Sequence, residues 1–113
     1  MRIQLLTTEL GIRRLPPDAQ APDLPCGEFV SITRTAEELS IVGAGRGFRC
    51  FKLEGPLDFS LVGVLASISA ALAKAGVPIF AISTHDTDYI LVGESHLERA
   101  IAALEQDGHI VRR

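Results

Sequence analysis

The chain of 113 residues has only two cysteines and no long apolar run. Cys26 and Cys50 lack CxxC spacing and a histidine companion, so we expect neither a zinc site nor a disulfide framework. They are interpreted as free buried thiols of a cytoplasmic protein. No apolar run approaches the roughly 18 residues of a membrane span, and the opening MRIQLLTTEL is not typical of a signal peptide. We therefore expect no membrane partner.

Basic residues are also few. Lysine and arginine number 11 against 14 acidic residues, for a net charge of −3, and the only basic clusters are Arg13-Arg14 and Arg112-Arg113. This scatter argues against nucleic acid as a partner. The sequence also lacks a nucleophile elbow with a Ser–His–Asp order and a recognisable pair of catalytic carboxylates. We therefore expect no enzyme activity, and no cofactor.

Hydrophobic residues make up 47% of the chain, enough for a buried core. The C-terminal half predicts strands at 48–55, 77–84, 88–93 and 109–111, and helices at 60–76 and from Ser95 to Gly108. Gly76 and Gly108 suit positions just past helix ends, and Ser95-His96-Leu97-Glu98 is typical of a capping box. The order β-α-β-β-α-β predicts a ferredoxin-like domain, with two helices on one face of a four-stranded antiparallel sheet.

The first of these helices has a single charged residue, Lys74. Its outer face carries the small residues Ala66, Ser69, Ala70 and Ala73. A helix that is small or apolar all round is usually buried all round. We therefore expect it to be covered by the N-terminal half, by a second subunit of a homodimer or other homo-oligomer, or by both.

The N-terminal half shows a partial repeat. With an offset of 50, FVSITRTAEELSIVG (29–43) aligns without a gap with IFAISTHDTDYILVG (79–93). This similarity predicts two copies of one strand–turn–strand unit, with two unrelated hairpins as the alternative. Four prolines within 16–25 exclude a helix there, so the first copy is expected to be truncated. We predict a truncated β unit at 1–47 and a complete domain at 48–113.

Two loops stand out. GAGRG (43–47) lacks the GxGxxG spacing of a nucleotide-binding loop and precedes a strand, so we interpret it as a flexible connector. The second hairpin carries six consecutive polar side chains, from Ser83 to Asp88. That run predicts either a turn stabilised by its own aspartates or a wall of a ligand site. A metal site at His85, Asp86 and Asp88 is not favoured, because no second histidine or cysteine is near in the sequence.

The segment EGPLDFSLVGVLASISAALAKAGVPIFAISTHDTDYILVG resembles the ACT domain, a ferredoxin-like module that binds amino acids in metabolic regulators. AGVPIFAIST is similar to the regulatory ACT modules of aspartate kinases. The whole chain, including SITRTAEELSIV and RLPPDA, resembles small bacterial tandem-ACT proteins and is similar to the cytosolic arginine sensor. The resemblance covers about residues 28 to 108 and implies an α+β fold, with a ferredoxin-like βαββαβ ACT domain preceded by a truncated, mostly β ACT-like repeat.

The resemblance implies a non-enzymatic regulator in which a free amino acid lies between two ACT units. The implied ligand-binding residues are Asp58, Phe59, Ser60, Leu61, Val62, Gly63, Ile79, Phe80, Thr84, His85, Asp86 and Asp88. The start of the helix suits the carboxylate of an amino acid, and the aspartates suit its ammonium. Phe59, Ile79 and Phe80 would form an apolar wall.

Each of these residues also has a purely structural interpretation. Asp58 can cap the helix, Gly63 can allow close helix–sheet packing, and the aromatic residues are core residues by default. Arginine is not favoured as the ligand, because Leu61-Val62 stand where the arginine sensor has an acidic residue, and His85 and Thr87 where it has aromatic ones. The alternative function is an interaction or dimerisation module that keeps the ACT fold without a ligand.

Overall fold

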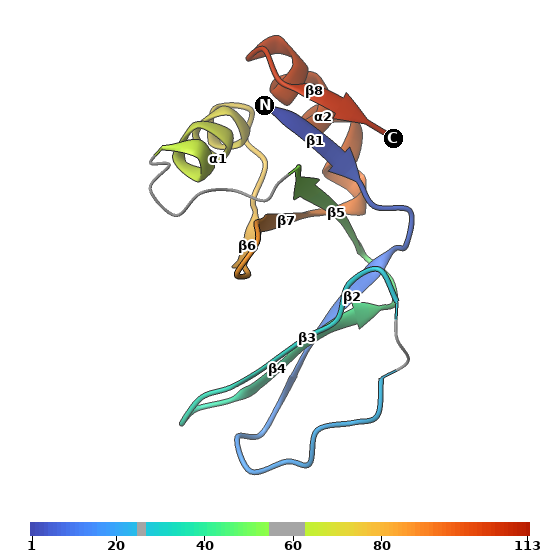
Figure 1. Cartoon of the computed structure of the whole chain (residues 1–113). Helices are drawn as coiled ribbons and strands as arrows, with labels where there is room; N and C mark the ends of the chain where they lie inside the picture. The colour runs from blue at the N-terminus through green and yellow to red at the C-terminus, as the bar shows by residue number, and fades with distance from the viewer. Residues whose placement is uncertain (25–26, 55–62) are drawn as a thin grey trace.

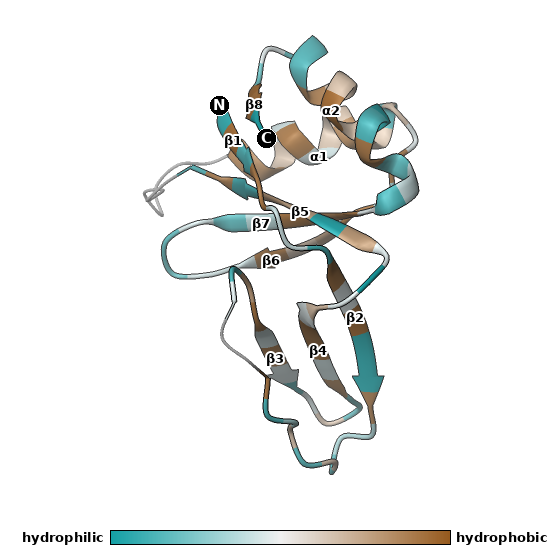
Figure 2. Cartoon of the chain, turned by 90° about the vertical axis from the view of Figure 1, so that its right-hand side faces the viewer, coloured by the Kyte–Doolittle hydropathy of each residue, from teal (hydrophilic) through white to brown (hydrophobic). Residues whose placement is uncertain are grey.

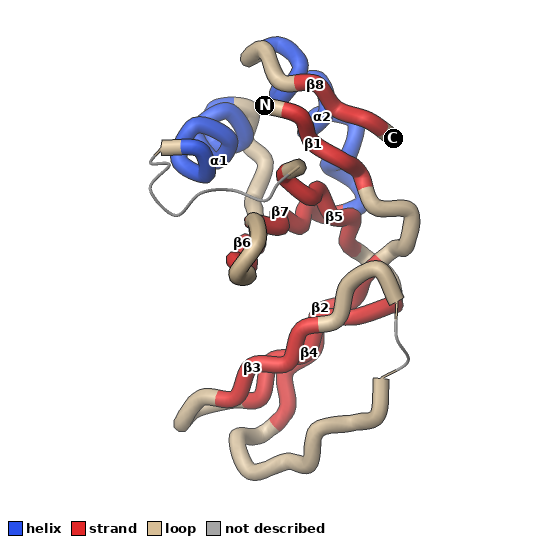
Figure 3. The backbone as a smooth tube through the Cα atoms, in the orientation of Figure 1, coloured by secondary structure: helices blue, strands red, loops and turns tan. Residues whose placement is uncertain are grey.

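The computed structural model describes residues 1–24, 27–54 and 63–113 (Figure 1). Its strands are β1 (Arg2–Leu5), β2 (Leu10–Leu15), β3 (Ser31–Arg34), β4 (Leu39–Ala44), β5 (Phe48–Leu53), β6 (Phe80–Ser83), β7 (Asp88–Gly93) and β8 (Ile110–Arg112). Its helices are α1 (Val64–Lys74), the 3₁₀ turn η1 (Glu94–His96) and α2 (Leu97–Gln106). The order β5-α1-β6-β7-α2-β8 is the predicted βαββαβ order, and both α-helices lie on one face of the sheet (Figure 3).

One feature of this sheet differs from the prediction. Strand β1 lies between β5 and β8, antiparallel to β5 and parallel to β8, with Ile3 opposite both Leu53 and Val111. The strands β6, β7 and β5 are antiparallel as expected. Because β1 is inserted, the part of the sheet under the helices has five strands instead of four, and β1 and β8 form a parallel pair. Ile3 and Leu5 are both buried in the core under the helices, so insertion of β1 buries apolar surface that β8 alone would leave open.

The helix starts compare with the sequence prediction in different ways. Helix α1 is described from Val64, with Gly63 as its N-cap at φ 86°, and its predicted start at residue 60 lies outside the described residues. Ser95 forms no capping box, because η1 takes up Ser95 and moves the start of α2 to Leu97, where no side chain caps the helix. The helix ends are confirmed: Gly76 (φ 74°) and Gly108 (φ 91°) adopt the left-handed conformation that glycine tolerates.

The core under the helices is formed by side chains from both helices and the facing strands. Ile68 and Leu72 of α1 are buried in it, together with the predicted inward face of α2, which is Leu97, Ala100, Ile101 and Leu104. The outward face of α1 is uncovered: Ala66, Ala70 and Ala73 are exposed. Of the alternatives predicted to cover it, the N-terminal strands β2–β4 lie on the opposite side of the sheet (Figure 2), so within the described residues they do not cover this face, and a second subunit stays a prediction.

A second apolar core joins the N-terminal strands to the other face of the sheet. Strands β2, β4 and β3 form an antiparallel extension, linked to β5 through the pair Leu10–Phe48. The Phe29 and Tyr89 rings lie 4.6 Å apart, between the segment before β3 and strand β7. Cys50 is buried in this core as a free thiol, and burial raises its pKa to about 12. Cys26 lies outside the described residues.

The two predicted hairpins have the same turn but a different register from the sequence alignment. Strand pairs close at Arg34–Leu39 and at Ser83–Asp88, which aligns the hairpins at an offset of 49 instead of 50. In both turns the first threonine, Thr35 or Thr84, donates its amide to the carbonyl three residues on, at 2.9 Å. The two turns therefore have the same hydrogen bonds. Their structural alignment is shifted by one residue from the best alignment of the two sequences.

The GAGRG segment is bonded at several points, unlike the flexible connector predicted from its glycines. The Gly45 amide donates to the Glu9 carbonyl at 3.0 Å, and the Gly47 amide donates to the Glu9 carboxylate at 2.7 Å. Gly47 also accepts the Glu94 amide at 2.8 Å. In a phosphate-binding loop the backbone amides donate to the phosphate. Here the Gly47 amide already donates to the carboxylate of Glu9.

The Phe29–Tyr89 contact allows a direct test of how the N-terminal strands are held. Replacing Phe29 with alanine removes a ring that is 7% exposed and should lower the free energy of unfolding by about 3 kcal/mol. Urea denaturation measures this change, with Val30→Ala as the control, because Val30 is 40% exposed. Equal stability of the Phe29→Ala and Val30→Ala proteins would contradict the contact.

His109 predicts a pH dependence of stability. Burial, and then the nearby N-terminal ammonium, lower its pKa, while Asp107, whose carboxylate is 3.7 Å from Nε2, acts in the opposite direction. Because the unfolded chain binds a proton at His109 more readily, the free energy of unfolding should fall as pH drops from about 7 to about 5. His109→Gln should reduce this slope in urea titrations at several pH values.

Candidate functional site

The polar turn between β6 and β7 is anchored to the end of β5. Thr84 closes the turn by bonding the Thr87 carbonyl through both its amide (2.9 Å) and its hydroxyl (3.0 Å). The Thr87 side chain is 4% exposed, and its hydroxyl donates to the Leu53 carbonyl at 2.6 Å. Leu53 is the last residue of β5, so this bond holds the turn at the point where the chain leaves the sheet toward α1.

The start of α1 belongs to the same end of the sheet. The helix follows β5 and precedes β6 in the chain, so it runs back along the sheet, and Figure 1 draws it to the side of the end of β5. Its first helical bond runs from the Ser67 amide to the Gly63 carbonyl, at 2.8 Å. The amides before Ser67 therefore have no acceptor within the helix, and glycine at the N-cap supplies no side chain to cap them. These amides carry the positive end of the helix dipole.

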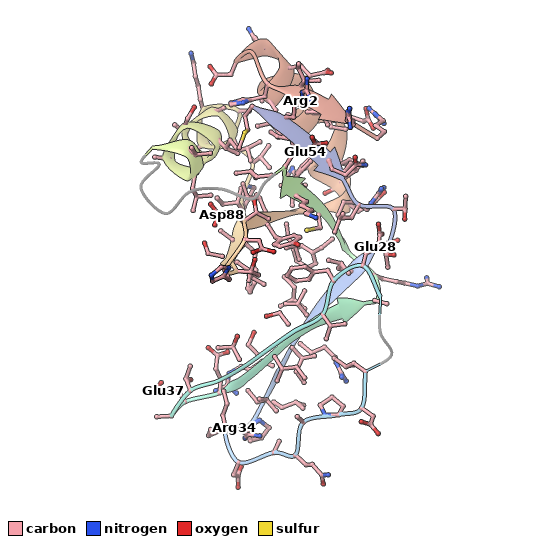
Figure 4. All side chains as sticks on the ribbon, in the orientation of Figure 1. Arg2, Glu28, Arg34, Glu37, Glu54 and Asp88 are labelled. Atoms are coloured by element: carbon pink, nitrogen blue, oxygen red, sulfur yellow. The ribbon has the colours of Figure 1, made fainter. Side chains whose placement is uncertain are left out.

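Carboxylates lie at this end as well (Figure 4). Asp86 is exposed and lies 3.0 Å from His85, while Glu54 pairs with Arg112 at 3.2 Å. Asp88 is half-buried, and its carboxylate makes no hydrogen bond or salt bridge with any residue that the structure describes. An unpaired, half-buried carboxylate favours a cationic partner such as an ammonium group.

The other predicted site residues divide into two groups. Asp58, Phe59, Ser60, Leu61 and Val62 lie outside the described residues, so their roles stay predictions. Ile79 and Phe80 lie at the opposite end of β6 from Thr84, because Phe80 pairs with Leu91 whereas Ser83 pairs with Asp88. Three residues of strand separate Phe80 from Ser83 by about 10 Å, so the structure does not bring Ile79 and Phe80 together with the turn.

Ile79 and Phe80 instead line a separate cleft of about 600 Å³. The cleft lies between the N-terminal strands and the face of the sheet opposite the helices. Its lining residues are Ile12, Phe48, Pro78, Ile79, Phe80, Leu91, Gly93, Ser95 and His96. Sequence reasoning missed this cleft, although alternation in β5 and β7 places Phe48 and Leu91 on the face away from the helices.

Two further observations bear on the chemistry. Over residues 1–24, 27–54 and 63–113, no three His, Cys, Asp or Glu side chains are grouped to hold a metal ion. None of the helices in those ranges is long and apolar enough to cross a membrane. Sequence reasoning also missed the role of Thr87, which it treated as one more polar turn residue. The signal that could have indicated this role is the position of Thr87, a threonine at the end of a turn and just before a strand with an apolar run.

Comparisons with known proteins identify both halves of the chain. The family described as ACT domain matches residues 43–106, and a family described as an N-terminal domain matches residues 8–45. A crystal structure of an Agobacterium tumefaciens protein is 35% identical over 98% of this chain and 91% of that one, with a TM-score of 0.91.

A second crystal structure, of a Vibrio cholerae protein, shows likeness in fold alone. That protein is described as being of unknown function and as a possible transport protein. It is 19% identical over 90% of this chain and 85% of that one, with a TM-score of 0.69.

The anchoring bond of the turn can be tested by one substitution. Thr87→Val keeps the shape of the side chain but leaves the Leu53 carbonyl without its donor, and should lower the free energy of unfolding by about 1 to 2 kcal/mol. Chemical denaturation measures the loss. Thr33→Val, at an exposed threonine of β3, should change stability little. If the two valine variants were equally stable, the Thr87 hydroxyl would not anchor the turn.

Proposed function

Because this chain belongs to the ACT-domain family, we propose that it is a non-enzymatic regulatory protein that binds a small free amino acid. ACT domains have regulatory, small-ligand-binding roles, and the two sides of the proposed site have the charges that an amino acid requires. The start of α1 offers amides that have no acceptor within the helix for the carboxylate. The turn offers carboxylates for the ammonium.

The observation that carries the proposal is the carboxylate of Asp88 beside the anchored turn, which has no partner among the described residues. The Thr87–Leu53 bond fixes the β6–β7 turn against the end of β5, so Asp88 is held in place at the base of the turn. A preorganised carboxylate loses little freedom when a ligand binds, which favours affinity. Thr84 lies at the other end of the same turn, although its hydroxyl is already bonded to the Thr87 carbonyl.

The nature of the ligand follows from the charge of this region. Glu54 is already paired with Arg112, which leaves Asp86 and Asp88 as the acidic side chains of the turn. Asp86 in turn lies against His85. One available carboxylate among the described residues suits the single ammonium of a small neutral amino acid better than the two cationic groups of arginine. Binding would regulate by favouring one state of the protein over another in its contact with a partner protein.

Substitution of Asp88 tests the proposal. In a thermal-shift screen with the twenty amino acids, a ligand at a hundred times its dissociation constant adds about 2.7 kcal/mol, or roughly 10 °C for a chain of this size. Asp88→Asn should abolish the shift while keeping the melting temperature of the free protein within a few degrees. Asp18→Asn, at an exposed loop residue, is the matched control and should retain the full shift.

Two results would contradict the proposal. A full shift in the Asp88→Asn protein would place the amino acid elsewhere. A flat response of the unmodified chain to all twenty amino acids would favour the second candidate function, a dimerisation module. The exposed small-residue face of α1, formed by Ala66, Ala70 and Ala73, supports that second function, since such a face is usually buried against another helix.

A further inference from the structure

The cleft at the opposite end of the sheet has the features of a second ligand site. Its walls come from different parts of the chain: Ile12 from β2, Phe48 from β5, Phe80 from β6 and Leu91 from β7. Its volume of about 600 Å³ lies within the range of small-molecule sites. It also lies where the N-terminal strands meet the sheet, and such junctions are frequent positions for ligands.

The walls of the cleft are apolar. Leu91 is completely buried at its base, while Phe48, Phe80 and Ile12 are half-buried and present part of their surface to the opening. Apolar surface of this kind gains about 25 cal/mol for each Å² that a ligand removes from water. The cleft therefore favours a molecule with an apolar body.

One rim of the cleft is polar. The ring of His96 lies over Gly93, where a Cβ atom would come within 3.3 Å of His96 Cδ2, so glycine leaves the room that the ring uses. His96 Nδ1 is buried and has no hydrogen-bond partner among the residues that the structure describes. A buried N–H without an acceptor is costlier than a bare nitrogen, so the proton belongs on Nε2. His96 and the exposed Ser95 thus offer two adjacent donors at the rim.

The described lining residues include no aspartate or glutamate, so none of them would pair with an ammonium group. We propose that this cleft binds a small apolar monocarboxylate that lacks an ammonium group, with Ser95 and His96 donating to its two oxygens. The carboxylate stays at the open rim, where water continues to solvate it, and the apolar body contacts Phe48, Phe80 and Leu91. The cleft and the Asp88 end of the sheet differ in place and in chemistry, so this proposal does not depend on the proposed function.

Matched ligands test the proposal on the full chain. 3-Phenylpropanoate and L-phenylalanine differ only in the ammonium group. Titration followed by two-dimensional amide NMR should show saturable shifts with 3-phenylpropanoate at Phe48, Phe80, Leu91 and His96, and weaker or no shifts there with L-phenylalanine. The alcohol 3-phenylpropan-1-ol should bind more weakly than the carboxylate. Equal affinity for all three compounds, or no saturable shift at millimolar 3-phenylpropanoate, would overturn the proposal.

Variants separate this site from the other end of the sheet. His96→Leu removes the ring donor and should weaken 3-phenylpropanoate about tenfold, equal to about 1.4 kcal/mol, while melting temperature confirms that the variant is folded. Asp88→Asn should leave this affinity unchanged, although it removes the thermal shift expected with an amino acid. If His96→Leu binds 3-phenylpropanoate as the unmodified chain does, or Asp88→Asn weakens it, the carboxylate does not lie at the His96 rim.

Discussion

The burial of β5 on both faces is the constraint on which the rest of the structure depends. Phe51 and Leu53 lie in the core under the helices, and Cys50 lies in the core that the N-terminal strands cover. A strand covered on two faces needs two layers of apolar side chains, and this short chain obtains the second layer from residues before β5. The N-terminal half therefore supplies part of the apolar layer on the second face of β5.

The same strand separates the two regions that differ in chemistry. The carbonyl of Leu53, at its end, receives the Thr87 hydroxyl and thereby fixes the acidic turn. Phe48, at its start, lines the apolar cleft beside β2. β5 thus has polar surroundings at one end and apolar ones at the other. Any coupling between the two ends would have to pass through a rigid, doubly buried strand, which resists local change.

Local patterns predicted most of the fold, and non-local pairing accounts for what they missed. The bounds of β7 and the glycines that end both helices follow from neighbouring residues. The insertion of β1 depends on contacts between Ile3 and Leu53, far apart in the sequence, which periodicity does not report. In the site, Ile79 and Phe80 were predicted to form an apolar wall of the same pocket as the turn, but the extended strand β6 separates them from the turn in space.

The repeated hairpin explains why only the second of the two hairpins has a carboxylate at the first residue after its turn. At the structural offset of 49, Thr35 corresponds to Thr84, and both close their turns in the same way. Leu39, which is buried, then stands in place of Asp88, and Glu38 in place of the buried Thr87. The first hairpin therefore uses its base to fill a core, whereas the second uses the same position to present a carboxylate. The same position of the hairpin is thus a buried leucine in the first copy and an aspartate in the second.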